Sequence, residues 1–134
     1  MILVDSNILM YAAGAEHPHK APCVALLDRI AAGEIDAAID AEVLQEILHR
    51  YRAIRRWEEG SQLYRLVRSI FTIVLPITAA VVDEARDLLE RHSHLMARDA
   101  LHAAIARRET GGEIYSFDLD FDSVEGIVRR IPGG

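Results

Sequence analysis

The sequence predicts an α/β fold built on a mainly parallel β-sheet. Short apolar runs rich in β-branched residues alternate with longer stretches whose apolar residues recur at helical spacing. Helices between such strands supply the right-handed crossovers that parallel strands require. With 134 residues the chain is long enough to bury a core, and no repeat, low-complexity tract or linker divides it. We therefore expect a single domain spanning residues 1–134.

The expected strands are short apolar runs bounded by turn residues. They cover residues 2–5, 35–39, 72–75, 114–116 and 127–131. Pro76 ends the third run because proline cannot donate a hydrogen bond to a neighbouring strand. Residues 118–123 are expected to form a loop or a short helical turn after the fourth run.

The expected helices fill the intervals between these strands. They cover about residues 6–14, 19–32, 40–56, 61–70, 78–92 and 98–109. Asp40 and Thr78 are suited to begin two of them, because their side-chain oxygens can accept hydrogen bonds from the first helical turn. Gly33 is expected to stop the second helix, and Gly60 to separate the third helix from the fourth.

The composition, 51% apolar and 27% charged, is that of a soluble globular protein. A net charge of −6 argues against broad electrostatic binding to nucleic acid, but leaves room for a local basic patch or a basic partner. Aromatic residues make up only 6% of the chain, so a platform for stacking on single-stranded nucleic acid is not obvious.

The sequence also predicts a cytoplasmic protein without a membrane association. Cys23 is the only cysteine, so no intrachain disulfide can form, which suits a reducing compartment; we expect it in the core. No charged leader precedes the N-terminal apolar run. Polar residues and a proline interrupt the longest apolar region, residues 70–82, so it is not expected to span a bilayer.

Four acidic residues occupy positions that such a fold could bring together. Asp5 ends the first expected strand and Asp118 follows the fourth, and ligand sites of parallel sheets form beyond the carboxyl ends of strands. Glu46 and Asp99 lie in helical patterns. Carboxylates gathered in one cleft repel each other, so they persist mainly where a hard cation compensates their charge. Mg²⁺ or Mn²⁺ held by oxygen ligands mostly serves phosphoryl chemistry.

Each of these residues also has a structural interpretation. Asp5 and Asp99 are suited to cap helices. Glu46 could be a solvated residue paired with Arg50, and Glu42 is a rival for its role.

The acidic loop and the one nearby histidine have structural interpretations as well. Asp118, Asp120 and Asp122 could form a solvated loop, although three carboxylates so close together favour a nearby cation. His102 is interpreted as a polar residue at a helix edge that could border the same cleft.

Four segments carry a resemblance to a known family. They are VDSNILMYA around Asp5, VLQEILHRY around Glu46, RDALHAAIA around Asp99 and IYSFDLDFDSVEGI around Asp118. With them the chain resembles the PIN-domain ribonucleases that form the toxin half of VapBC toxin–antitoxin pairs. The resemblance covers essentially the whole chain, and it rests on the order of four individually weak motifs. It implies a three-layer α/β/α PIN-like fold whose central, mainly parallel sheet has four to five strands.

The resemblance also implies the membership of the site. The catalytic residues would be Asp5, Glu46, Asp99 and Asp118. The first, third and fourth of these would hold Mg²⁺, or Mn²⁺ in its place. Asn7 and Ser116 match the supporting polar positions of the family. Asp120 could share the role of Asp118, and the choice between these two stays open.

The implied activity is that of a Mg²⁺-dependent endoribonuclease and toxin. Its partners would be RNA, a cognate antitoxin and a second copy of the chain. A basic run provides the candidate contacts with RNA or antitoxin: Arg50, Arg52, Arg55 and Arg56. The same run could instead be a solvated face balanced by Glu58 and Glu59. The alternative function is a non-catalytic PIN-like module that binds RNA or another protein.

Overall fold

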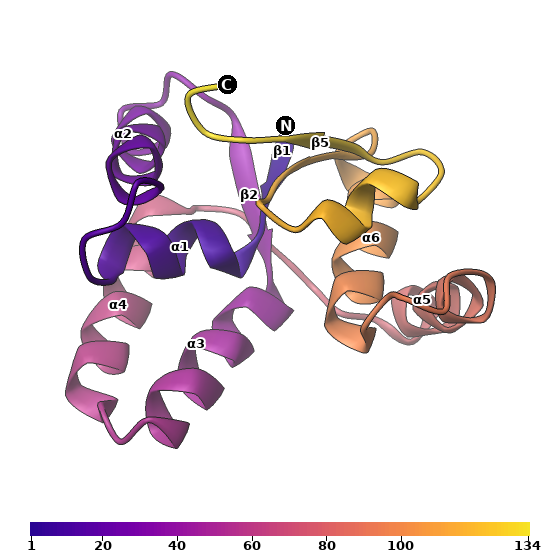
Figure 1. The fold of residues 1–134 in the computed structure, drawn as a ribbon, viewed down its shortest axis with the longest axis horizontal. Coiled ribbons are helices and arrows are strands. Elements are labelled where there is room, and N and C mark those ends of the chain that lie inside the picture. Colours follow the sequence, from indigo (N-terminus) through magenta and orange to yellow (C-terminus); the bar gives the residue numbers. More distant parts are fainter.

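The computed structural model describes residues 1–134 as a five-stranded sheet between two layers of helices (Figure 1). All neighbouring strands are parallel. Their order is β3 (Val74–Leu75), β2 (Ala37–Asp40), β1 (Ile2–Val4), β4 (Glu113–Tyr115) and β5 (Val128–Arg130). The predicted α/β/α class is therefore confirmed, and every strand boundary lies within two residues of its predicted position.

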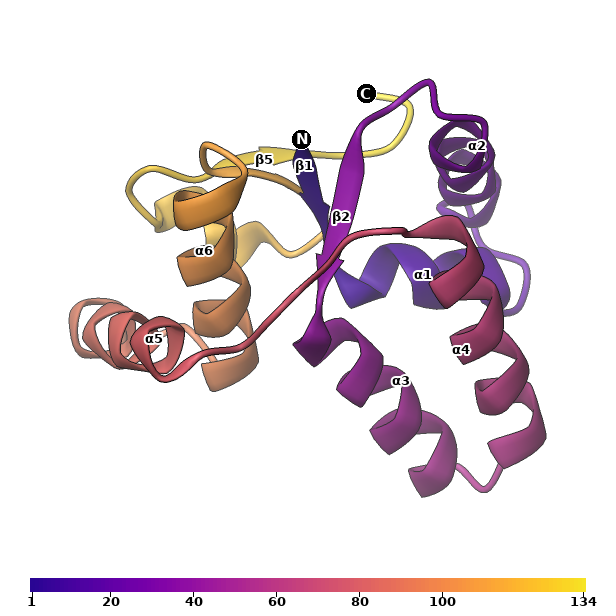
Figure 2. The same cartoon turned by 180° about the vertical axis from the view of Figure 1, so that it is seen from behind.

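The helices divide unequally between the two faces of the sheet (Figures 1 and 2). One face carries α1 (Ser6–Ala13), α2 (Lys20–Ala31), α3 (Ala41–Ala53) and α4 (Trp57–Ile70). The other face carries α5 (Ala79–Arg91) and α6 (Ala97–Glu109), and the short 3-10 helix η1 (Leu119–Ser123) follows β4. None of these helices combines the length and the apolar composition that crossing a bilayer requires.

Local sequence accounts for the helix starts after β2 and β3. The Asp40 carboxylate accepts a hydrogen bond from the Val43 N–H at 3.1 Å, and the Thr78 hydroxyl accepts one from the Val81 N–H at 3.2 Å. Each bond satisfies an N–H group that the first helical turn leaves free. Both predicted caps are therefore confirmed.

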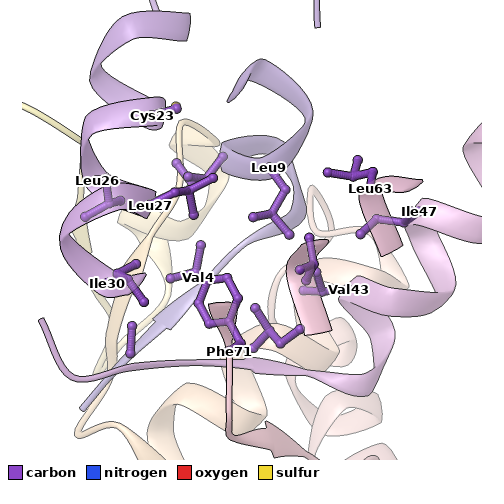
Figure 3. Close-up of a cluster of buried hydrophobic side chains, with 14 of the residues drawn as sticks. Val4, Leu9, Cys23, Leu26, Leu27, Ile30, Val43, Ile47, Leu63 and Phe71 are labelled. Carbon is purple, nitrogen blue, oxygen red and sulfur yellow. The ribbon is translucent and has the colours of Figure 1, made fainter. Parts of the chain in front are cut away.

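The core has two parts, because side chains of a strand point alternately to opposite faces. In β1, Ile2 and Val4 join a cluster with the helices α1 to α4, whereas Leu3 joins a cluster with α5 and α6. Figure 3 shows the first cluster, in which Val4 and Phe71 lie among the apolar residues of α2 and α3. Cys23 is fully buried there, as predicted, and burial raises the pKa of its thiol to about 11.

The connection between α3 and α4 differs from the prediction. Helix α3 ends at Ala53, Arg55 adopts a positive φ of 59° in the turn, and α4 already begins at Trp57. Gly60 therefore lies inside α4 and does not separate the helices. A Cβ atom at Gly60 would lie 2.4 Å from the Cβ of Tyr51, which is too close for any side chain. The glycine thus allows α4 to approach α3 closely, a contact that the sequence does not reveal.

Candidate active site

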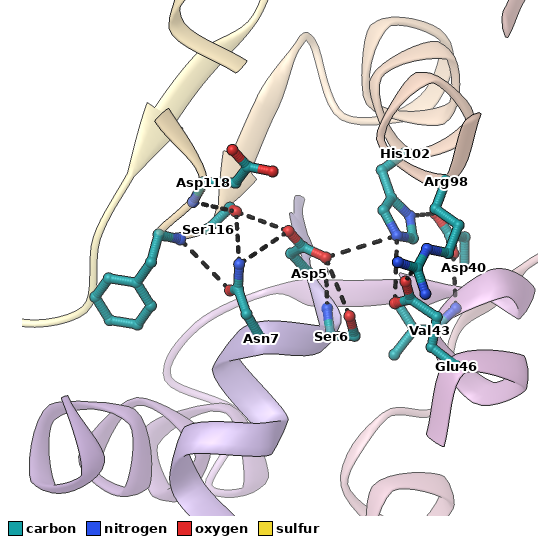
Figure 4. A network of polar contacts seen from close by, with 11 residues as sticks. Asp5, Ser6, Asn7, Asp40, Val43, Glu46, Arg98, His102, Ser116 and Asp118 are labelled. Carbon is teal, nitrogen blue, oxygen red and sulfur yellow. Dashed lines mark hydrogen bonds and ion pairs between the residues drawn. The ribbon is translucent and has the colours of Figure 1, made fainter. Parts of the chain in front are cut away.

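The acidic residues meet at the carboxyl ends of the central strands. From β1 the chain builds the sheet outward through β2 and β3, and it later returns to add β4 and β5 on the opposite side of β1. Ligand sites of parallel sheets form where the strand order reverses in this way. Asp5 follows β1 and Asp118 lies just beyond β4, so both fall at this reversal point (Figure 4).

Asp5 is buried and accepts four hydrogen bonds, two of them from the N–H and the hydroxyl of Ser6. Its Oδ1 accepts from the Ser6 N–H at 2.7 Å, which caps α1. Its Oδ2 accepts from the Ser116 hydroxyl at 2.7 Å and from the Asn7 side-chain amide at 3.2 Å. The capping interpretation of Asp5 is therefore correct, and the two predicted supporting residues both contact its carboxylate. Burial raises the pKa of Asp5, although nearby His102 partly opposes this.

The same hydrogen-bond network fixes the acidic loop after β4. The Ser116 hydroxyl accepts a hydrogen bond from the Asp118 N–H at 3.0 Å. The carboxylate of Asp118 in turn accepts one from the Asp120 N–H at 2.9 Å. Ser116 thus connects Asp5 to the loop that carries Asp118 and Asp120.

The carboxylates form two adjacent groups. Oxygen atoms of Asp99, Asp118 and Asp120 lie within 4.8 Å of one another, and atoms of Asp5, Glu46 and His102 form a second set within the same distance. Burial and the negative charges of Asp118 and Asp5 raise the pKa of Asp99 to about 7. Both Asp118 and Asp120 lie beside Asp99, so the choice between them stays open.

Asp99 does not cap α6. The helix begins at Ala97, and the residue in the capping position is Met96, which makes no side-chain capping bond. Asp99 lies in the first turn with its carboxylate half-buried and directed toward other carboxylates. The structural interpretation of Asp99 as a helix cap is therefore wrong.

Glu46 is also not the solvated residue of the structural interpretation. Its side chain is only 12% exposed, and its Oε1 pairs with the Nε of Arg98 at 3.1 Å rather than with Arg50. Burial raises its pKa, but His102 and Arg98 outweigh burial and lower the pKa overall. Its Oε2 is buried without a hydrogen-bond partner. The rival Glu42 is in neither acidic group.

His102 borders the acidic cleft, as one sequence interpretation allowed, but it is not the polar residue at a helix edge that the other interpretation predicted. Its side chain is completely buried, and its Nδ1 lies 2.6 Å from the Oδ2 of Asp40. Its Nε2 lies 3.6 Å from the Oδ1 of Asp5 and 3.8 Å from the Oε2 of Glu46. Burial lowers the pKa of His102, but the carboxylate of Asp40, aided by Glu46, raises it well above the ordinary value. The imidazole is therefore buried among three carboxylates that favour its protonated form.

One signal for this arrangement was present in the sequence. Asp40 ends β2 as Asp5 follows β1, so it belongs to the same edge of the sheet. A helix cap already accounted for an acidic residue there, so Asp40 was not expected to contact the site. The partner of its second oxygen, His102, lies far along the chain on the buried alanine-rich face of α6.

The donor set suits a hard divalent cation. The site gathers five carboxylates: Asp5, Glu46, Asp99, Asp118 and Asp120. In the group with Asp5 and Glu46, only Arg98 and His102 supply positive charge. In the group with Asp99, burial and the negative charges of neighbouring carboxylates raise the pKa of Asp99. Carboxylate oxygens are the ligands that Mg²⁺ and Mn²⁺ prefer, so these residues fit a metal site.

A groove of about 730 Å³ runs from Glu46 along α1 and α3, and Glu46 is the one carboxylate of the acidic site that lines it. Ser6, Asn7, Glu46 and Arg98 line it beside the carboxylates. Its other lining residues include Tyr11 from α1, His17 from the loop after α1, and His49 and Arg50 from α3.

Only one member of the predicted basic run lines this groove. That residue is Arg50. The guanidinium of Arg52 instead lies 4.4 Å from the ring centre of Trp57, and Arg56 pairs with Glu59 at 3.7 Å. Arg55 is exposed in the turn between the helices. The four arginines thus do not form one surface around the site.

Fold and site together define a class of protein. A parallel sheet with carboxylates at the ends of its central strands is the arrangement of a PIN domain, and the PIN domain family matches residues 2–127. Ribonuclease VapC13 of Mycobacterium tuberculosis is 47% identical over 129 residues, which are 96% of this chain and 98% of that protein. The chain therefore belongs to the VapC family of PIN-domain ribonucleases.

Solved structures share this fold despite low sequence identity. VapC20 of Mycobacterium tuberculosis, described as a sarcin–ricin loop cleaving toxin, superimposes with a TM-score of 0.77 at 17% identity, covering 95% of this chain and 97% of that one. VapBC2 from Rickettsia felis, bound to a DNA fragment from its promoter, gives a TM-score of 0.76 at 20% identity, with 98% of each chain covered.

Proposed function

We propose that this chain is a metal-dependent endoribonuclease, and that residues 1–134 form a single PIN domain acting as the toxin of a cytoplasmic toxin–antitoxin pair. The observation that carries the proposal is the set of carboxylates at the strand ends, where burial and repulsion from Asp118 and Asp5 raise the pKa of Asp99 to about 7. A divalent cation would relieve this repulsion. The names of the relatives supply RNA as the substrate class.

Asp5, Asp99 and Asp118 would hold the metal ion, with Asp120 close enough to take part. Mg²⁺ is the expected ion and Mn²⁺ an alternative, because both prefer oxygen ligands. When bound, the cation would supply Lewis-acid activation of water and of the scissile phosphate. Asn7 and Ser116 would keep the Asp5 carboxylate in a fixed orientation through their hydrogen bonds.

Glu46 would act on the attacking water. Its carboxylate is ionised at neutral pH because His102 and Arg98 lower its pKa, and its Oε2 has no competing partner in the protein. It would orient the water and accept its proton as the new P–O bond forms. The P–O bond to the 3′ oxygen would break and that oxygen would take up a proton from solvent, leaving a 3′-hydroxyl and a 5′-phosphate.

The partners follow from the family and from the surface. A cognate antitoxin would cover the groove and the acidic site. A second copy of the chain would pack on the α3–α4 side, where Ile54, Trp57 and Leu66 are between 40% and 54% exposed. Burial of such side chains is what an interface between copies provides.

The test is cleavage of total RNA by purified protein freed of any partner, with the new ends mapped. Asp5→Asn and Asp99→Asn should reduce Mg²⁺-dependent cleavage by at least about 100-fold, because each removes a ligand of the metal. Asp122→Asn is the matched control, since Asp122 is an exposed acid of the same loop that pairs with Arg129. Equal cleavage by wild type and Asp5→Asn would refute the assignment. Binding of RNA without cleavage in Mg²⁺ or Mn²⁺ would favour the non-catalytic module.

A further inference from the structure

Four rings form a cluster beside the acidic site that the proposed mechanism does not use. The rings of His19 and Phe117 stack with centres 3.9 Å apart and planes only 9° from parallel. The ring of Tyr11 meets both at steep angles, with centres 5.0 Å and 5.3 Å away. His17 lies over Tyr11 at 4.7 Å. The cluster joins α1, the loop after it and the segment after β4.

This ring cluster is coupled to the acidic site by the backbone. The N–H of Phe117 donates to the Asn7 side chain at 3.4 Å, and the next residue along the chain is Asp118. The His17 ring is fixed as well, because its Nδ1 accepts from the His19 N–H at 3.0 Å. The position of the rings relative to the carboxylates is therefore defined by hydrogen bonds rather than by a free loop.

Two of the rings face the groove. Tyr11 and His17 line it, together with Asn7 and Glu46 from the acidic site. His19 and Phe117 do not line the groove, and their stack supports the two that do. Rings that could stack on a base are thus present beside the acidic site, although the chain has few aromatic residues.

The charges of the groove suit a nucleic-acid strand. Arg50 and Arg98 line the same groove, as do Glu16 and Glu46. Arg98 pairs with Glu46, whereas Arg50 makes no ion pair and is the positive charge open to a phosphate. Arginine side chains bind phosphate groups, and exposed aromatic rings stack on unpaired bases. A strand whose phosphate lies at the carboxylates would place a neighbouring base within the groove.

We propose that Tyr11 and His17 receive one unpaired base of the RNA, adjacent to the phosphate at the acidic site, while His19 and Phe117 hold these two rings in position. The inference rests on the proposed function, because RNA is its ligand. It assigns preference for single-stranded RNA to this ring cluster, since a base within a duplex presents no free face.

The experiment measures RNA binding without cleavage. Short single-stranded oligoribonucleotides, each with 2-aminopurine at one position, are titrated with Asp5→Asn protein and their fluorescence is recorded. One position should be quenched by stacking, and an abasic site there should weaken binding by at least about fivefold. His17→Ala, which removes an exposed ring, and Tyr11→Leu, which keeps apolar volume, should weaken binding to a similar degree and abolish the quenching.

The controls separate this inference from the nuclease assignment. Tyr64→Leu removes a half-buried tyrosine of α4 that does not line the groove, and it should leave binding and quenching unchanged. In the His17→Ala protein the abasic site should cause a smaller further loss than in wild type, because one of the two rings that receive the base is already gone. This result would support the stacking site even if wild-type protein cleaved no RNA.

Unchanged RNA affinity and quenching in both ring variants would overturn the proposal, even if wild-type protein cleaves RNA. Unchanged RNA binding by both ring variants together with weakened binding of the antitoxin would also overturn the proposal. It would assign the ring cluster to the protein partner.

Discussion

The charge of Asp99 should make the metal-free protein less stable. Burial and the carboxylates of Asp118 and Asp5 raise its pKa from 3.8 to about 7. The unfolded chain therefore loses this proton near pH 4, whereas the folded protein keeps it until about pH 7. Between these values rising pH favours the unfolded state, and above pH 7 the full penalty is present.

The magnitude follows from the size of this pKa difference. Taken in full, it corresponds to about 4 kcal/mol of lost stability at pH 8. Asp99 is only half-buried, and water screens its repulsion, so we expect about 1–2 kcal/mol. Asp99→Asn is uncharged at every pH and should regain this amount at pH 8. The gain should be small at about pH 4, where the wild-type carboxyl is protonated in the folded state and about half protonated in the unfolded state.

The assay is urea denaturation in EDTA at pH 4, 6 and 8. Asp122→Asn is the matched control with the opposite sign. The carboxylate of Asp122 pairs with Arg129 at 2.9 Å, which lowers its pKa, so its charge stabilises the fold above pH 4 and loses this effect as pH falls further. Its replacement should slightly destabilise the protein at pH 8. If Asp99→Asn were no more stable than wild type at pH 8, or equally stabilised at pH 4, the electrostatic reasoning would be wrong.

Addition of Mg²⁺ gives the complementary result. A cation that binds only the folded protein stabilises it by about 2.7 kcal/mol at a hundred times its dissociation constant. Wild type should gain stability with Mg²⁺ concentration, whereas Asp99→Asn should gain much less because a ligand is missing. The difference in stability between Asp99→Asn and wild type at pH 8 should therefore shrink or change sign when Mg²⁺ is added.

Three further substitutions test the packing and the support of the site. Gly60→Ala should lower the free energy of unfolding by about 1–3 kcal/mol in urea, because the clash with Tyr51 exceeds the gain in helix propensity; a stabilised variant would contradict the close contact. Asp40→Ala should cost about 3–5 kcal/mol, since it removes the carboxylate that lies 2.6 Å from the buried His102 ring together with the cap of α3, and a loss of only about 1 kcal/mol would reduce its role to helix capping. Ser116→Ala should weaken Mg²⁺ binding about 10- to 100-fold in calorimetric titration while the protein stays folded, and unchanged affinity would exclude a supporting role.

The fold could be predicted from the sequence because its signals are local. The alternation of β-branched runs with helical patterns placed all five strands, and the rule for parallel sheets placed Asp5 and Asp118 at the same edge. The break assigned to Gly60 was wrong for a physical reason. A glycine within a helical pattern indicates a break or a close contact equally well, and only the position of Tyr51 in space decides between them.

The parts of the site that escaped prediction depend on pairs of residues far apart in the chain. His102 lies on a helix whose alanines conceal which face is buried, and its partner Asp40 already had a sufficient role as a cap. The ring cluster likewise joins Phe117 to Tyr11 and the histidines after α1, so the low aromatic content of the whole chain gave no hint of it.

Helices on both faces of the sheet contribute carboxylates to the site, and this has a consequence for how its activity could be regulated. Glu46 belongs to α3 on one face of the sheet, Asp99 and His102 belong to α6 on the other, and only the shared edge brings them together. Each layer packs its own apolar cluster. Asp5, one of the proposed metal ligands, caps α1 on the first face, so a bound cation shared with Asp99 would connect the two separately packed clusters. A partner that moved α6 away from α3 would separate the carboxylates without contacting any of them.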